Sequence, residues 1–109
     1  MARILLISDE CHSKAVASVL ENRGHTVTLL SERRRVQNHI DTDLAQINII
    51  ILNFSNRPED WELLDKVRRL TVTCFPKPGI LCLSRLNLGT EVRLRVQQKG
   101  ARLVYERPA

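Results

Sequence analysis

The sequence is poor in aromatic residues and glycine, and it contains no long apolar run. Only 4% of its 109 residues are aromatic, which argues against a platform that stacks single-stranded nucleic acid. Four glycines are present and no Gly-rich loop follows a predicted strand, so we expect no phosphate loop for a nucleotide. No apolar stretch reaches the length of a membrane span, and the start, MARILLISDE, lacks the apolar core of a signal peptide. These absences predict a cytoplasmic protein.

Cysteine and histidine are too few and too scattered to form a recognisable metal site. Cys11, Cys74 and Cys82 are odd in number, widely spaced and without a CxxC pair, which favours free thiols. The three histidines have no ligand-like spacing with these cysteines. The sequence therefore predicts no bound metal and no cofactor.

The net charge of +5 includes one short basic cluster, Arg33–Arg35. We interpret this charge as solvated basic surface, with a phosphate-contacting patch as the alternative, so nucleic acid is an unlikely partner on these grounds. With 43% hydrophobic and 27% charged residues, residues 1–109 have the composition and the length of one globular domain.

The segment Ile47–Asn53, read INIIILN, is the most informative stretch of the chain. Its aliphatic residues do not alternate with polar ones, so neither face of an extended segment is suited to water. That pattern is typical of a central parallel strand covered by helices on both sides. The β-branched isoleucines and the short length favour a strand over a buried helix.

Strand-like and helix-like segments alternate along the rest of the chain. The predicted strands are Arg3–Ser8, Thr26–Leu30, Ile47–Asn53, Ile80–Ser84 and Arg102–Tyr105. The predicted helices are His12–Asn22, a short polar one near Val36–Ala45, one that opens at Pro58, and Leu88–Lys99. Short alternating elements of this kind predict a right-handed, doubly wound α/β sheet.

Helical spacing also predicts which side chains point inward. On the first helix Ala15, Val16, Val19 and Leu20 share one face. On the helix after Pro58 the inward face is Trp61, Leu64 and Val67, where we expect Trp61 to be core packing, and Phe54–Arg57 is expected to form a polar loop before it.

Ligands of doubly wound sheets bind beyond the carboxyl ends of the strands, at the topological switch point. The residues to examine are therefore Ser8–Glu10, Asn53, Ser84 and those that follow Tyr105.

Taken together, these positions resemble the receiver domain of two-component response regulators. The resemblance runs from RILLISDE through NIIILNFSNRPEDWELLDKVRRL and PGILCLS to KGARLVYERP, and it rests on order and spacing. It implies a flavodoxin-like sheet of five parallel strands in the order 2-1-3-4-5, surrounded by five helices. It also implies an acidic pair after the first strand, an acceptor aspartate ending the third, Ser or Thr after the fourth, and Lys-Pro after the fifth.

Several of these family positions carry a different residue in this chain. The acidic pair falls on Ser8 and Asp9, with Glu10 next, and the acceptor falls on Asn53, one residue closer than usual to the next helix. The positions that match the family's pocket are Ser8, Asp9, Glu10, Asn53, Ser84, Arg107 and Pro108.

These departures remove the family's chemistry. A neutral amide at Asn53 is not the carboxylate nucleophile that accepts a phosphoryl group. A magnesium ion would lose two of its carboxylates, leaving Asp9 with weak help from Glu10. Arg107 keeps the positive charge as a planar fork, which suits a bidentate ion pair with Asp9. We therefore expect a degenerate pseudo-receiver that is not an enzyme.

We expect the family's last helix to be missing, because the chain ends four residues after Tyr105. One flank of the sheet should then expose apolar surface from the first and fifth strands, and exposed patches of this kind mark partner sites. We expect another protein or a second copy to cover it, with a piece trimmed from a longer regulator as the alternative.

Other functions remain open on particular residues. The chain could be a phosphoacceptor that uses another carboxylate, such as Asp9, or a basic DNA-associated adaptor. Cys11 follows the first strand as the phosphocysteine of sugar-transport phosphotransferase B domains does, but the adjacent carboxylates would repel phosphate. Tyr105 stands one residue beyond the family's switch aromatic, so we expect it on the other face of its strand.

Overall fold

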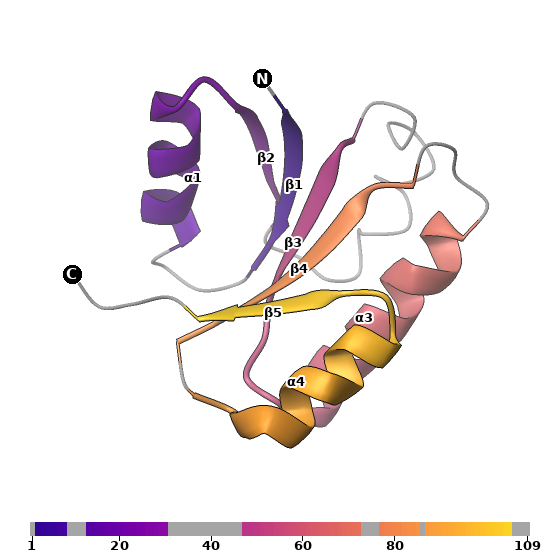
Figure 1. Ribbon diagram of the computed structural model, residues 1–109. Coiled ribbons are helices and arrows are strands. Elements are labelled where there is room, and N and C mark those ends of the chain that lie inside the picture. Colours follow the sequence, from indigo (N-terminus) through magenta and orange to yellow (C-terminus); the bar gives the residue numbers. More distant parts are fainter. Residues whose placement is uncertain (1, 9–12, 31–46, 73–76, 86, 106–109) are drawn as a thin grey trace.

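The computed structural model describes residues 2–8, 13–30, 47–72, 77–85 and 87–105. Within them the chain forms one sheet and three helices (Figure 1). The strands are β1 (Arg3–Ile7), β2 (Thr26–Leu30), β3 (Ile49–Asn53), β4 (Gly79–Ser84) and β5 (Arg102–Tyr105). The helices are α1 (Ser13–Asn22), α3 (Pro58–Thr71) and α4 (Gly89–Gln98).

All five strands are parallel and pair in the order β2-β1-β3-β4-β5. Helix α1 lies on one face of the sheet beside β1 and β2, whereas α3 and α4 lie on the opposite face (Figure 1). The order of the strands reverses between β1 and β3, so their carboxyl ends form the switch point of the sheet. The predicted doubly wound sheet with order 2-1-3-4-5 is confirmed, and no helix follows β5 within the described residues.

The core has two parts, one on each face of the sheet. The larger part lies against α3 and α4, and the smaller part lies against α1. The larger cluster is Leu5, Ile7, Ile50, Leu52, Phe54, Leu63, Leu64, Val67, Ile80, Cys82, Val96, Ala101 and Leu103. The smaller cluster is Ile4, Leu6, Ala17 and Ile51. Strand β3 supplies side chains to both clusters, as its unbroken aliphatic sequence predicts.

The bounds of most elements agree closely with the prediction. Strands β2 and β5 have the predicted ends, and β3 begins at Ile49 instead of Ile47. Gly24 and Gly100 follow α1 and α4 with positive φ angles of 90° and 80°, as left-handed helix stops require. The helix predicted near Val36–Ala45 lies outside the described residues.

Two predictions about side chains were wrong. Phe54, which was placed in a polar loop, is fully buried, because it continues the alternation of Ile50 and Leu52 toward α3. On α1 the inward face is Val16, Ala17 and Leu20, while Val19 is 56% exposed and Ala15 is also exposed. The small Ala17 rather than Val19 meets the sheet, and the helical stripe is therefore rotated from the predicted one.

The turn between β3 and α3 is fixed by a buried carboxylate. Asp60 is 1% exposed, and its Oδ2 accepts hydrogen bonds from the backbone N–H groups of Ser55 at 2.9 Å and Arg57 at 3.2 Å. The Arg57 Nε also lies 3.6 Å from this oxygen, although the Arg57 side chain is 48% exposed. Asp60 thus satisfies backbone donors at the helix start, where a negative charge also complements the helix dipole.

Replacing Asp60 should destabilise the fold because the partly buried N–H groups of Ser55 and Arg57 would lose their acceptor. We expect Asp60→Ala to lower the free energy of unfolding by about 2–3 kcal/mol. Glu59→Ala is the matched control, since Glu59 is in the same helical turn but its side chain is 55% exposed. It should change the free energy of unfolding by less than about 0.5 kcal/mol. Urea titrations followed by circular dichroism measure both, and equal effects would contradict this role for Asp60.

Candidate functional site

Three of the residues predicted to form the functional site lie at the carboxyl edge of neighbouring strands. Ser8 follows β1, Asn53 ends β3 and Ser84 ends β4, and these strands are adjacent in the sheet. The exposed fractions of the three residues are 4%, 6% and 0%, so all of them are buried. The predicted switch point therefore brings these three positions together. The other predicted site residues, Asp9, Glu10, Arg107 and Pro108, lie outside the described residues.

Backbone hydrogen bonds hold this edge in place. The Ser8 N–H donates to the Leu30 carbonyl at 3.0 Å, and the Phe54 N–H donates to the Leu83 carbonyl at 2.9 Å. Asn53 pairs with Leu83 in the register of β3 and β4. The position of the Asn53 side chain is therefore set by the sheet itself, and by the burial of Phe54 immediately after it.

The Asn53 side chain has an unusual environment. Its Nδ2 is buried and has no hydrogen-bond partner among the residues that the structure describes. A buried donor without an acceptor costs about 1–3 kcal/mol, so such groups are rare in folded proteins. Asn53 therefore carries an energetic cost at the position where the fold places its functional residues.

The described part of this edge offers little to a metal ion. Magnesium prefers carboxylate and phosphate oxygens, whereas Ser8, Asn53 and Ser84 supply two hydroxyls and an amide. Among the residues that the structure describes, no group of three or more His, Cys, Asp or Glu side chains is arranged to hold a metal ion. These three positions alone do not fit the Mg²⁺ that the resemblance implies.

Cys82 lies on β4 in the larger core cluster and is a free thiol. Burial, together with the nearby Asp60 carboxylate, raises the pKa of this thiol to about 12. The thiol therefore stays protonated at neutral pH and cannot act as a nucleophile. Cys11 and Cys74 lie outside the described residues, so their state stays a prediction.

Trp61 connects α3 to α4 and to the turn after β3. Its ring meets Phe54 edge-on, with centroids 4.9 Å apart, and its indole N–H donates to the Asn56 Oδ1 at 2.8 Å. The Arg95 guanidinium, from α4, lies 4.7 Å from the centroid of the Trp61 ring. The Lys99 ammonium, directly after α4, lies 5.9 Å from it. Trp61 packs against the core as predicted. The cations above it were not predicted, because they come from a distant helix.

Tyr105 at the end of β5 is also held by α4. It packs against the larger cluster, and the Arg93 guanidinium lies 5.0 Å from its ring centroid. The Tyr105 side chain is therefore on the α3 and α4 side of the sheet. This contact restrains the ring by a cation–π interaction.

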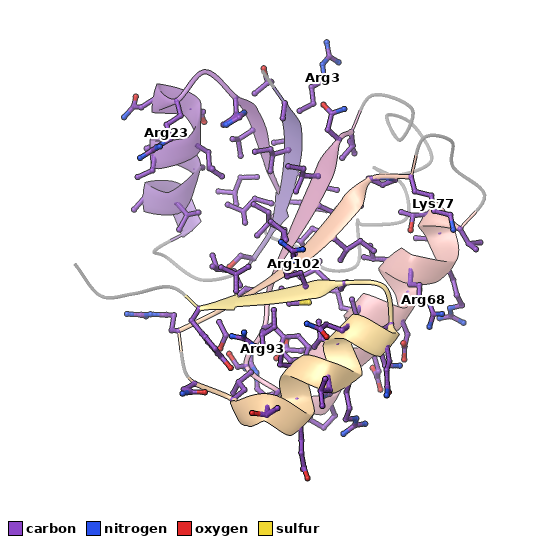
Figure 2. The ribbon with its side chains drawn as sticks, viewed as in Figure 1. Arg3, Arg23, Arg68, Lys77, Arg93 and Arg102 are labelled. Carbon is purple, nitrogen blue, oxygen red and sulfur yellow. The ribbon has the colours of Figure 1, made fainter. Side chains whose placement is uncertain are left out.

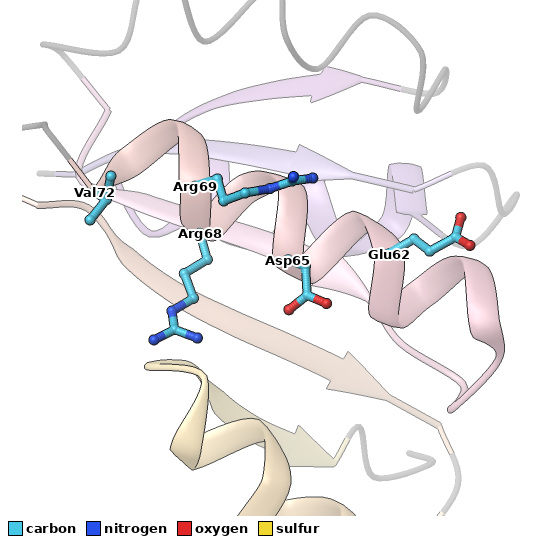
Figure 3. A pocket seen from close by; sticks show the side chains of 5 residues that line it. All are labelled: Glu62, Asp65, Arg68, Arg69 and Val72. Carbon is cyan, nitrogen blue, oxygen red and sulfur yellow. The ribbon is translucent and has the colours of Figure 1, made fainter.

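A hollow on α3 has no arrangement suited to chemistry. Figure 3 shows Glu62 and Arg69 extending to one side of the helix, and Asp65 and Arg68 to the other. Acidic residues toward the start and basic residues toward the end of a helix complement its dipole. We interpret this surface as a solvated helix face.

Most of the described basic side chains are spread over different elements rather than gathered along one groove. Of the six that Figure 2 labels, Arg68 and Lys77 lie near each other and line one hollow together with Lys99, whereas Arg3, Arg23 and Arg102 come from other parts of the fold. A groove that follows a nucleic-acid backbone needs such charges on one face or along one helix. The described cations do not form one.

On the α1 side of the sheet, the helices that the structure describes leave side chains of β4 and β5 partly exposed. We name the residues Leu81, Leu83, Arg102 and Val104 the β4–β5 surface. Leu81 pairs with Arg102 and Leu83 with Val104, so all four point to the same side. Leu81 and Leu83 are partly buried beside the smaller cluster, and Val104 is 38% exposed. Exposed apolar surface was predicted for the first and fifth strands. It is found on β4 and β5, whereas Ile4 and Leu6 of β1 are buried beside Ala17 of α1.

No family model and no curated protein matches this chain. By contrast, 77 chains of solved structures match it. They include a response regulator receiver domain protein from Clostridium thermocellum, which is 18% identical to this chain with a TM-score of 0.79. The matched region covers 100% of this chain and 85% of the Clostridium chain. The receiver domain of a Francisella response regulator is 16% identical with a TM-score of 0.77, covering 97% of this chain and 84% of its own.

A third similar structure is the receiver domain of a histidine kinase from Arabidopsis thaliana, solved with Mg²⁺ and BeF₃⁻. It is 16% identical with a TM-score of 0.73 and covers 95% of this chain and 80% of its own. Sequence identities this low establish a shared fold. The function has to be argued from the residues of the site. The protein has the flavodoxin-like fold of a response regulator receiver domain.

Proposed function

We propose that this protein is a non-catalytic, receiver-like signalling module that acts by binding another protein and is not phosphorylated at the usual position. The observation that carries the proposal is Asn53, a buried neutral amide at the end of the central strand. Phosphoryl transfer needs a carboxylate nucleophile there. In this proposal residues 1–109 act as one cytoplasmic domain without enzymatic activity.

The β4–β5 surface supports the second half of the proposal. Its leucines are partly buried and its valine is exposed, so they leave apolar surface accessible on the α1 side of the described fold. Apolar surface that is left exposed next to a packed core is typical of an interaction site. The occupant is another protein or a second copy of this chain.

An alternative is a phosphoacceptor that uses a different carboxylate, such as Asp9. Asp60 is the buried carboxylate on α3, the helix after Asn53, but its Oδ2 already accepts two backbone hydrogen bonds and faces Arg57. It is therefore committed to holding the turn. The alternative is therefore tested at Asp9.

Incubation with acetyl phosphate and magnesium, read by intact mass, separates the two functions. We expect the native protein to gain no phosphoryl group, because an amide does not attack phosphorus. A phosphoryl adduct that is cleaved by hydroxylamine and lost in Asp9→Ala would favour the alternative. Asp65→Ala removes a partly exposed carboxylate of α3 and serves as the control.

Replacing Asn53 by an apolar residue of similar shape should not harm the fold. Because its Nδ2 has no partner within the described part of the chain, we expect Asn53→Leu to leave the free energy of unfolding unchanged or to raise it by about 1–3 kcal/mol. Ser84→Ala is the matched control at the same edge, since Ser84 is fully buried and makes polar contacts. It should lower the free energy of unfolding by about 1 kcal/mol. Denaturant titration decides, and a loss in Asn53→Leu as large as in Ser84→Ala would mean that the amide is structural.

A further inference from the structure

The β4–β5 surface combines an apolar floor with positive charge. Leu81, Leu83 and Val104 form the floor, and Arg102 stands among them because it is the register partner of Leu81. In Figure 2 the Arg102 side chain lies on the side of β5 away from α4, whereas Arg93 lies between β5 and α4. Arg102 is exposed, and no acidic residue occurs on β4 or β5.

Other charge near this surface is also positive. Arg85, directly after β4, is exposed and adds a second guanidinium at the carboxyl end of the strand. The whole chain has a net charge of +5. A second copy placed on this surface by a two-fold axis would bring the two Arg102 side chains toward each other, and like charges across an interface are costly.

The spacing of the floor suits a helix. Side chains on one face of a strand repeat about every 6.6 Å along it, and one turn of an α-helix advances about 5.4 Å. A helix laid along β4 and β5 can therefore place apolar residues of successive turns over Leu81 and Leu83. It would also complete on this side the layer that α1 begins, as helices do in doubly wound sheets.

We propose that the β4–β5 surface binds an amphipathic helix of a partner protein, with an apolar stripe over Leu81, Leu83 and Val104 and acidic residues facing Arg102. This inference rests on the proposed function, because it names the kind of partner that the module binds. A nucleic acid would neutralise Arg102 but would leave the aliphatic floor exposed. A second copy would cover the floor but bring the arginines together.

The test uses a fluorescent synthetic peptide with leucine at helical spacing and glutamate on both flanks of the leucine stripe. Fluorescence anisotropy follows its binding to the full chain, and a peptide with lysine in place of glutamate tests the charge. We expect the acidic peptide to bind at least about tenfold more tightly than the basic one, because complementary charge favours the right partner. Duplex DNA should not displace it.

Two substitutions within the surface and two outside it locate the site. Arg102→Glu removes the positive charge, and Val104→Asp places a carboxylate on an exposed part of the floor, so each should weaken binding about tenfold or more. The matched controls on exposed positions of α3 and α4 are Arg68→Glu and Leu94→Asp, which should change affinity by less than about twofold. Circular dichroism confirms that each variant is folded.

Several results would overturn the inference. They are the absence of saturable binding by the acidic peptide, equal binding of the basic peptide, equal loss in the control variants, and displacement by DNA. A dimer in sedimentation experiments that Val104→Asp dissolves would assign the surface to a second copy instead. Phosphorylation is measured separately by intact mass. If the peptide fails to bind and the protein gains no phosphoryl group, the helical partner is refuted while the proposal of a non-catalytic module stands.

Discussion

The burial of β3 on both faces is the constraint on which the rest of the structure depends. Ile50 and Leu52 face the cluster under α3 and α4, while Ile51 faces the one under α1. Full burial of one such side chain contributes about 1.5–3 kcal/mol before chain entropy is subtracted. Because the same strand joins both halves of the core, its register fixes the depth of Asn53 at the carboxyl edge. The Asn53 side chain is thus held in place by aliphatic packing.

The elements that sequence patterns predict well are those whose environment is uniform along the segment. The unbroken aliphatic run at Ile49–Leu52 favours a buried strand. The glycines after α1 and α4 mark the ends of these helices. Phe54 and Val19 were assigned wrongly because their burial depends on how a neighbouring element packs, which periodicity within one segment does not contain. The burial of Asp60 follows from the tight turn that precedes the helix, which periodicity along the helix does not reveal.

The sequence predicted where the candidate site lies better than it predicted the surroundings of its side chains. Doubly wound topology directs attention to the strand ends, and Ser8, Asn53 and Ser84 do meet there. That no described residue pairs with the Asn53 Nδ2 could not be foreseen, because it depends on the atoms that surround the side chain in three dimensions. Folded proteins tolerate such costs mostly at functional positions, where stability is exchanged for another property.

Trp61 is the only tryptophan in the chain, and its indole contacts three separate parts of the molecule. The N–H is bonded to Asn56 in the turn after β3, the ring edge meets Phe54, and two cations from the α4 region lie above it. Indole emission is sensitive to nearby charge and to water. Any sliding of α4 against α3 would therefore alter the intrinsic fluorescence of the unlabelled protein, which gives the chain its own optical reporter of that helix pair.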